Sequence, residues 1–183
     1  FYDYLIESGV KEEQIISIAL DDDTFIKYRD PEELSKFIRA QIVSKDMYYI
    51  LIDEVQYAIA KEELKNPDSI RLYNVLNGLM RLRNVDIYVT GSNSKMLTKD
   101  VLTVFRGRGD EVRVYPISFK EYYTAIGGDK IDAYEEYALY GGMPLVLSRK
   151  TGNDKMAYLQ SLFTEVYFKD ITERYDIALP DVL

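Results

Sequence analysis

The sequence YYILIDEVQ occupies residues 48–56 and indicates the class of fold. A continuous apolar and aromatic run ends here in two acids, Asp53 and Glu54. An uninterrupted run of this kind is typical of a strand that is buried on both faces of a parallel sheet. Ligands of open parallel sheets bind beyond the carboxyl ends of the strands, which is where the two acids would lie. The stretch therefore predicts a parallel sheet with a polar site at its edge.

Similar runs before and after this stretch extend the sheet. Residues 15–20 form a short apolar, β-branched run, and Val85–Val89 (VDIYV) are predicted to be the third strand. Residues 111–115 alternate in polarity as a fourth strand would. Helix signals separate these runs: Asp30 and Pro31 form a helix start, and residues 72–80 carry apolar side chains at helical spacing. Strands that alternate with helices predict an α/β fold, a parallel sheet covered by helices on both faces, over residues 1–117.

The rest of the chain, residues 118–183, is predicted to be a small helical region. Ser118 and Glu121 form a capping box at the start of one helix, and a second helix is expected to stop at Gly141. A long helix is expected over residues 153–175, with Met156 and Phe163 on its apolar side.

The composition excludes several classes of chemistry. Among 183 residues there are 23 basic and 31 acidic side chains, a net charge of −8, which argues against binding to nucleic-acid backbones. Cysteine and histidine are both absent, which excludes disulfides, thiolate zinc sites and imidazole catalysis. No membrane span and no secretory signal are visible, so a cytoplasmic protein is expected. Carboxylates, lysine, arginine, tyrosine and hydroxyls remain for chemistry.

Asp53 and Glu54 match what a Walker B strand requires. The first carboxylate of that motif holds Mg²⁺ through water, and the second polarises the attacking water molecule. On this motif alone, a strand that simply ends in solvated acids explains the two residues equally well.

Residues 90–93 place neutral hydrogen-bonding side chains after the next strand. Thr90, Ser92 or Asn93 could touch both a γ-phosphate and the attacking water, so Thr90 is a predicted cofactor-binding residue. Taken alone, a glycine turn with Ser92 or Asn93 capping the next helix is the better explanation.

Two other charged groups have a functional and a plain interpretation. Arg106 and Arg108 are flanked by glycines and suit an arginine finger, although, taken alone, a pair of surface arginines that answer nearby acids is the favoured explanation. The acids at residues 21–23 could hold a metal, but three successive acids after a strand are more often a solvated loop.

Five segments in order resemble one family. YYILIDEVQ, VDIYVTGSNSKML, GRGDEVRVYPISFKEYY, YGGMP and FKDITERY are similar to bacterial and archaeal AAA-type ATPases that carry a C-terminal nuclease-like domain. The resemblance covers nearly the whole chain and implies a P-loop-type sheet. It also implies that Asp53 is the Mg²⁺-site aspartate, Glu54 the catalytic glutamate, Ser92 or Asn93 the sensor residue, and Arg108 the arginine finger.

The chain departs from this family in two places. No Gly-x-x-x-x-Gly-Lys-Ser/Thr loop is present, and Gly109 leaves the choice of finger between Arg106 and Arg108 open. The sequence also begins at Phe1 rather than Met. We therefore expect an internal fragment of a longer ATPase, without its first strand, phosphate loop or C-terminal domain. ATP and Mg²⁺ are the expected cofactors of the complete protein. The fragment itself is expected to hold neither tightly and to be inactive.

Loss of the first strand has an expected consequence for partners. The resemblance places that strand between the third and fourth strands named above, and its loss leaves backbone groups unpaired. Self-association, domain swapping, strand rearrangement or a retained N-terminal peptide would close the gap. We expect no membrane and no nucleic-acid partner.

Two other classes of protein fit part of the pattern. A phospho-acceptor receiver domain would use Asp22, Asp53, Thr90 and Lys120 in this order, but the spacing suits it poorly and Lys120 falls within a helix. A non-catalytic interaction module would keep the acids on its surface and bind a protein through its tyrosine-rich helices.

Overall fold

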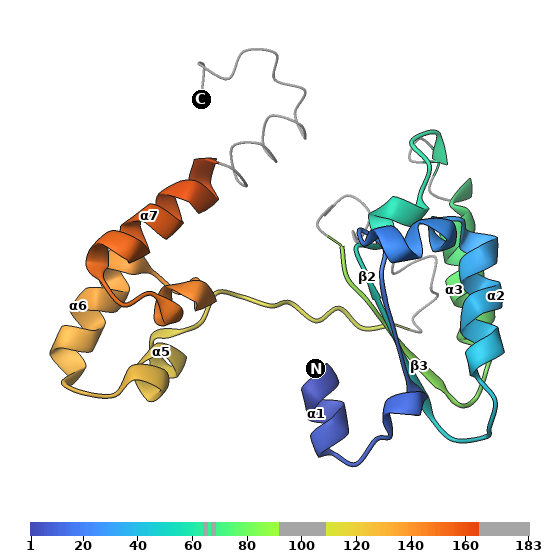
Figure 1. Ribbon diagram of the computed structural model, residues 1–183, viewed down its shortest axis with the longest axis horizontal. Coiled ribbons are helices and arrows are strands. Elements are labelled where there is room, and N and C mark those ends of the chain that lie inside the picture. Colours follow the sequence, from blue (N-terminus) through green and yellow to red (C-terminus); the bar gives the residue numbers. More distant parts are fainter. Residues whose placement is uncertain (64–65, 67–68, 92–108, 165–183) are drawn as a thin grey trace. The chain divides into compact units, whose positions relative to one another are not determined.

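A computed structural model describes residues 1–63, 66, 69–91 and 109–164. The chain divides into two compact units, Phe1–Glu111 and Val112–Leu183, and each is considered by itself. Strands lie in the first unit, and the described part of the second is helical (Figure 1). Among the described residues, no helix combines the length and the apolar character needed to cross a membrane.

A parallel sheet forms the centre of the first unit. In the described residues it consists of β1 (Ile15–Ala19), β2 (Tyr48–Asp53) and β3 (Val85–Val89), in the order β1-β2-β3. Ile52 on β2 is in register with Ile18 on one side and with Val89 on the other. The stretch YYILIDEVQ therefore supplies the central strand, and the predicted α/β fold with a parallel sheet is confirmed.

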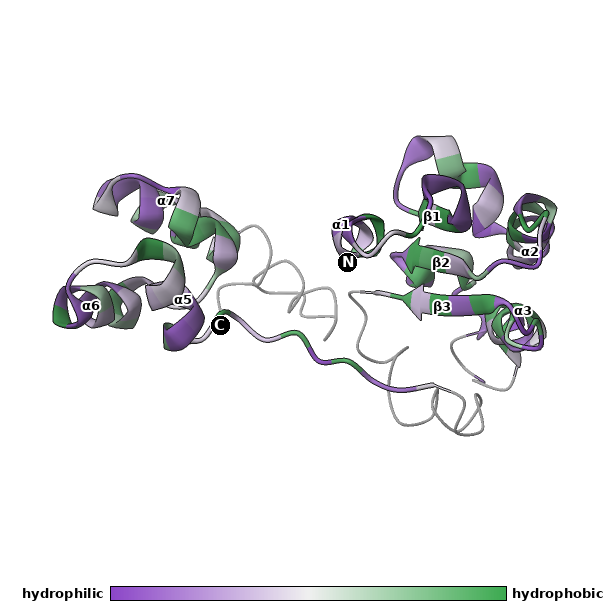
Figure 2. Ribbon diagram, turned by 90° about the horizontal axis from the view of Figure 1, so that it is seen from below, coloured by the Kyte–Doolittle hydropathy of each residue, from purple (hydrophilic) through white to green (hydrophobic). Residues whose placement is uncertain are grey.

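Helices lie on both faces of this sheet. Helices α2 (Pro31–Gln41) and α3 (Arg71–Leu79) cover one face, and α1 (Tyr2–Glu7) lies beside the other (Figure 2). Asp30 caps α2, as predicted, because its carboxylate accepts hydrogen bonds from the first turn of the helix. The described residues of this unit also form the 3-10 turns η1 (Glu12–Gln14), η2 (Asp23–Arg29) and η3 (Val55–Ala58).

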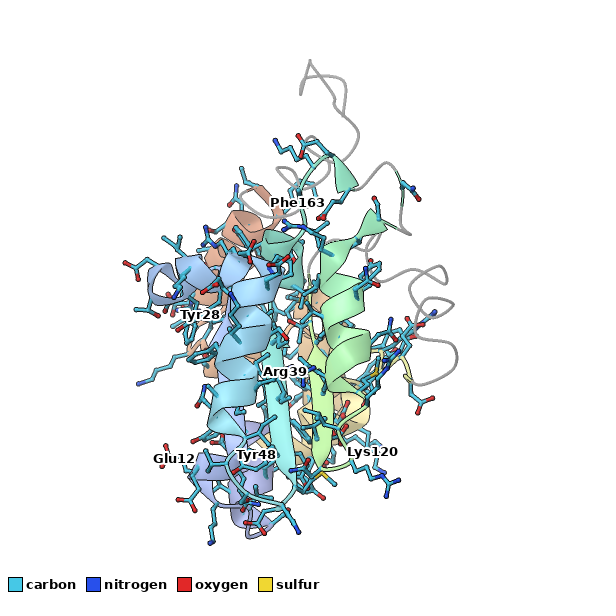
Figure 3. All side chains as sticks on the ribbon, turned by 90° about the vertical axis from the view of Figure 1, so that its right-hand side faces the viewer. Glu12, Tyr28, Arg39, Tyr48, Lys120 and Phe163 are labelled. Carbon is cyan, nitrogen blue, oxygen red and sulfur yellow. The ribbon has the colours of Figure 1, made fainter. Side chains whose placement is uncertain are left out.

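The apolar core lies between the sheet and helices α2 and α3. Alternation along β2 is clear, because Ile50 and Ile52 are buried, Leu51 is half-buried and Asp53 is exposed. Arg39 of α2 lies between the two helices in Figure 3, and a Cβ atom on Gly78 of α3 would come within 3.4 Å of its guanidinium. The two helices therefore pack closely over the buried face of the sheet.

The predicted fourth strand is wrong. Residues 111–115 adopt no regular structure, and Val112 and Val114 are 82% and 92% exposed. Alternating polarity shows only that a segment suits one face of a sheet, whereas a strand also needs a neighbour for its backbone groups. This segment pairs with none of the described strands.

The second unit contains α5 (Phe119–Ile126), α6 (Lys130–Tyr140), the 3-10 turn η6 (Pro144–Ser148) and α7 (Gly152–Leu162). The capping box of Ser118 and Glu121 and the stop of α6 at Gly141, with φ at 71°, are confirmed. Gly142 packs against the backbone of Ile117, where a Cβ atom would lie 2.2 Å from the carbonyl oxygen. The part of the expected helix 153–175 that follows residue 164 lies outside the described residues.

The packing of α7 differs from the expected apolar face. Met156 and Phe163 are exposed, and the buried residue of this helix is Lys155, which is 7% exposed. Its ammonium group donates a hydrogen bond to Glu136 of α6 and lies 5.4 Å from the ring centre of Tyr140. The hydrogen bond from Lys155 lowers the pKa of Glu136. An ion pair therefore joins α6 to α7 where the sequence pattern indicated an apolar contact.

We predict that Ile50→Ala destabilises the first unit, because it opens a cavity in the middle of the central strand. Ile50 is fully buried, and such truncations cost about 2–5 kcal/mol. Urea denaturation followed by circular dichroism measures this loss. Val43→Ala is the matched control, since Val43 is 84% exposed and its truncation should cost almost nothing. Equal losses for the two variants would contradict the assigned core.

We predict that Glu136→Gln weakens the second unit in a pH-dependent way. A lowered pKa means that ionised Glu136 stabilises the fold above the ordinary glutamate pKa of about 4.3, and that this contribution disappears as the pH falls through the lowered value. Hydrogen–deuterium exchange of α5, α6 and α7 should be faster in the variant than in the wild type near neutral pH. The two should converge in acid, and Glu135→Gln, at an exposed neighbouring position, should have no effect. A difference that does not change with pH would contradict the ion pair.

Candidate functional site

The chain turns sharply where β2 ends. Asp53 is the last residue of the strand, and Glu54 follows with φ 55° and ψ 48°, in the left-handed region. Among the described residues, no other non-glycine residue has a positive φ. This conformation costs roughly 1–2 kcal/mol for a residue with a Cβ atom. Neighbouring groups must therefore hold the corner in place.

The residues that directly follow the two flanking strands supply these groups. On one side, the Thr90 backbone N–H donates to the Ile52 carbonyl at 2.9 Å, and the Val55 N–H donates to the Thr90 carbonyl at 3.0 Å. The Thr90 hydroxyl also donates to Oδ1 of Asp53. On the other side, the Leu20 N–H donates to the Asp53 carbonyl at 3.1 Å. The corner is thus fixed from both neighbours of the central strand.

The two oxygens of the Asp53 carboxylate differ in their surroundings. Oδ1 accepts the Glu54 backbone N–H at 3.1 Å in addition to the Thr90 hydroxyl. Oδ2 accepts no hydrogen bond from the described residues, and the side chain is exposed. One oxygen therefore orients the carboxylate and the other is available to a cation or to its water. Mg²⁺ is usually held by one or two carboxylates together with substrate phosphates, so this donor fits the metal.

Glu54 is half-buried and has a side-chain partner that the sequence analysis did not single out. The Gln56 side-chain amide donates a hydrogen bond to Oε2 of Glu54. The sequence feature that could have indicated Gln56 was its position two residues after Glu54 in YYILIDEVQ. The contact depends on the 3-10 turn η3, which sequence spacing alone did not reveal.

The acidic loop after β1 has a structural role. Asp22 accepts hydrogen bonds from the Thr24 hydroxyl at 2.7 Å and from the Thr24 backbone N–H at 2.8 Å, and it caps η2. These bonds lower the pKa of Asp22. In the described part of the chain, no group of three or more acids is placed to hold a metal. The turn geometry favours the interpretation of residues 21–23 as a capped loop.

The structure brings together part of the predicted site. Asp53, Glu54 and Thr90 meet at the carboxyl end of β2 and β3. Ser92 and Asn93 lie outside the described residues. The same is true of both candidate finger residues, Arg106 and Arg108. Lys120, which a receiver domain would need at the acids, lies on α5 in the second unit.

Comparison with known proteins places the chain in a family. An uncharacterized protein of Haemophilus influenzae is 29% identical over 189 residues, which cover all of this chain and 44% of that protein. An uncharacterized protein of Methanocaldococcus jannaschii is 24% identical over 189 residues, which cover 97% of this chain and 38% of that protein. The chain thus spans less than half the length of either relative. No solved structure gives a significant match. The family model described as "AAA domain" matches residues 1–123, more than half of the chain and all of the corner around Asp53, and the chain therefore belongs to the AAA domain family.

Proposed function

We propose that this chain supplies the magnesium-binding and water-activating acids of an ATP-hydrolysing AAA domain. The observation that carries the proposal is the corner at the end of β2, where Asp53 and Glu54 are held beside Thr90 within the region that the family model matches. Two adjacent acids at the carboxyl end of a central parallel strand are where a nucleotide-hydrolysing site needs them.

Asp53 is the proposed ligand of the metal, through the carboxylate oxygen that accepts no hydrogen bond from the described residues. Thr90 and the Glu54 backbone hold the other oxygen and so fix the direction of the carboxylate. Bound Mg²⁺ would neutralise charge on the phosphates. Thr90 is proposed to position Asp53 and to lie at the cofactor site.

Glu54 is the proposed general base. Its carboxylate accepts a proton from the water molecule whose oxygen attacks the terminal phosphorus of ATP, while the bond from that phosphorus to the leaving ADP oxygen breaks. Ser92 or Asn93 would sense the terminal phosphate, and Arg108, or Arg106 in its place, would stabilise the charge that develops there.

The phosphate-binding loop is proposed to come from sequence outside these 183 residues. No Gly-x-x-x-x-Gly-Lys-Ser/Thr segment occurs in the chain, and both relatives are more than twice as long as the part that matches. Backbone amides and the lysine of such a loop supply most of the contacts to the phosphates. The complete protein is therefore the proposed ATPase, with ATP and Mg²⁺ as its cofactors.

An additional strand is proposed to pair with the open edge of β3. Within the described residues β3 has a neighbour on one side only, which is β2. The backbone groups along such an open edge are ones that a further strand would satisfy. The strand would come from the complete protein or, in the isolated chain, from a second copy through domain swapping.

We predict that Glu54→Gln in the complete protein lowers kcat for ATP hydrolysis about 10²–10⁴-fold, because the proton acceptor is lost. ATP affinity should be retained, since the amide keeps the shape of the carboxylate.

Asp53→Asn should also lower the rate of ATP hydrolysis and should raise the Mg²⁺ concentration that hydrolysis requires. Steady-state phosphate release and equilibrium binding of labelled ATP measure both effects. Glu62→Gln, at an exposed position outside the corner, is the control. Unchanged hydrolysis in Glu54→Gln would favour a non-catalytic interaction module.

We predict that the isolated 183-residue chain shows no saturable binding of Mg·ATP. Asp53 and Glu54 alone would contact only the metal and the attacking water. The phosphate-binding loop, which would make most of the contacts to the phosphates, is not part of these 183 residues. Isothermal titration calorimetry is the direct measurement, with the complete protein titrated in parallel as the positive control. Tight, stoichiometric binding by the isolated chain would contradict the proposed division of the nucleotide site.

A further inference from the structure

The side chain of Gln56 contacts the proposed general base directly. Its amide nitrogen Nε2 donates to Oε2 of Glu54. We propose that Gln56 is a positioning residue, which holds the Glu54 carboxylate in one orientation and so sets the rate of the hydrolytic step. The inference rests on the proposed function, because it assigns a role to a residue next to the general base of that site.

The hydrogen bond gives the two carboxylate oxygens of Glu54 different roles. Oε2 is occupied by the Gln56 amide, whereas Oε1 accepts no hydrogen bond from the described residues. An unrestrained glutamate samples several side-chain rotamers, and in most of them the oxygen that should accept the proton points elsewhere. An anchored carboxylate presents the same oxygen to the water at every turnover, as efficient general-base catalysis requires.

Gln56 is itself held on a rigid support. It lies in η3, where Val55 and Ala58 are buried in the core. The next residue, Tyr57, stacks against the Arg29 guanidinium, whose central carbon lies 4.7 Å from the ring centre. Arg29 Nε in turn donates to the Leu20 carbonyl at 2.7 Å. A side chain on such a fixed turn can transmit its position to Glu54.

The bond is not needed to form the corner. Backbone hydrogen bonds already hold it, from the Val55 N–H to the Thr90 carbonyl at 3.0 Å and from the Tyr57 N–H to the Glu54 carbonyl at 3.1 Å. These bonds fix the left-handed backbone of Glu54 but do not determine its side-chain orientation. The Gln56 amide acts on the carboxylate itself. Non-glycine residues that are kept in left-handed conformations are concentrated at functional sites, where the surrounding structure holds them.

The test is Gln56→Met in the complete protein, which keeps the length of the side chain and removes the amide donor. We expect kcat for ATP hydrolysis to fall about tenfold, less than for Glu54→Gln, because the base remains but is less often oriented. The KM and the equilibrium affinity for ATP should not change. Without nucleotide, hydrogen–deuterium exchange in the peptide that covers residues 53–58 should stay at the wild-type level, because backbone hydrogen bonds hold the corner. Gln56→Glu, which also lacks the amide, should lower kcat at least as far.

Gln14→Met is the matched control. The side-chain amide of Gln14 also donates a hydrogen bond, to the Met47 carbonyl at 2.9 Å. This contact lies just before the start of β2, whereas Gln56 lies after the end of that strand. This variant should keep the wild-type kcat and wild-type exchange in residues 53–58. A comparable loss of kcat in both variants would show a general effect on folding and would overturn the proposal.

Other outcomes separate this inference from the proposed function. If Glu54→Gln abolishes hydrolysis but Gln56→Met has the wild-type kcat, the positioning role fails and the proposed function stands. If Glu54→Gln hydrolyses ATP normally, the proposed function fails and the inference with it. The double variant should be no slower than Glu54→Gln alone, because Gln56 acts through Glu54. A further loss in the double variant would overturn the proposal.

Discussion

The hydrogen bonds between Thr90 and the end of β2 are the constraint on which the rest of the site depends. They link the carbonyl of Ile52, the carboxylate of Asp53 and the N–H of Val55 to the residue that directly follows the neighbouring strand β3. Because the chain is held there, Glu54 keeps a left-handed backbone that few residues other than glycine adopt. Val55 then enters the core, and both acids stay at the edge of the sheet. The hydrogen bonds at the ends of these parallel strands thus hold the adjacent acids Asp53 and Glu54 in a fixed arrangement.

The sheet and its helices explain why the acids lie at this edge. Apolar side chains on one face of β2 are buried under α2 and α3, which fixes the register of the strand. The apolar run ends at the buried residue Ile52, and the residue that follows it, Asp53, is polar and exposed. The core therefore determines where the strand stops, and the position of the acids follows from it. The proposed catalytic groups would need little reorganisation during turnover on such a rigid scaffold.

Much of the fold could be predicted from short sequence signals. Apolar runs located the three described strands, and the caps at Asp30 and Ser118 located helix starts, because these signals depend on residues close in sequence. The strand predicted at residues 111–115 was wrong for the opposite reason. A strand requires a neighbouring strand as its hydrogen-bonding partner, and alternating polarity does not indicate whether that partner is present. Lys155 was overlooked in favour of its apolar neighbours, since its burial depends on a carboxylate from another helix.

The same distinction applies to the site. Asp53 and Glu54 could be found from one strand motif, and Thr90 from the end of the next strand, because parallel strands bring their carboxyl ends together. Gln56 could not be assigned a role in this way. Its contact with Glu54 exists only because the chain turns through a left-handed residue into a 3-10 turn. We propose that, in the complete protein, this corner holds Mg²⁺ and activates the water that hydrolyses ATP. The decisive test is a crystal structure of the complete protein with Glu54→Gln, grown with Mg·ATP. We expect uncleaved ATP with the metal beside the Asp53 carboxylate and the amide of residue 54 facing the terminal phosphate. Nucleotide bound away from the carboxyl end of β2 would contradict it.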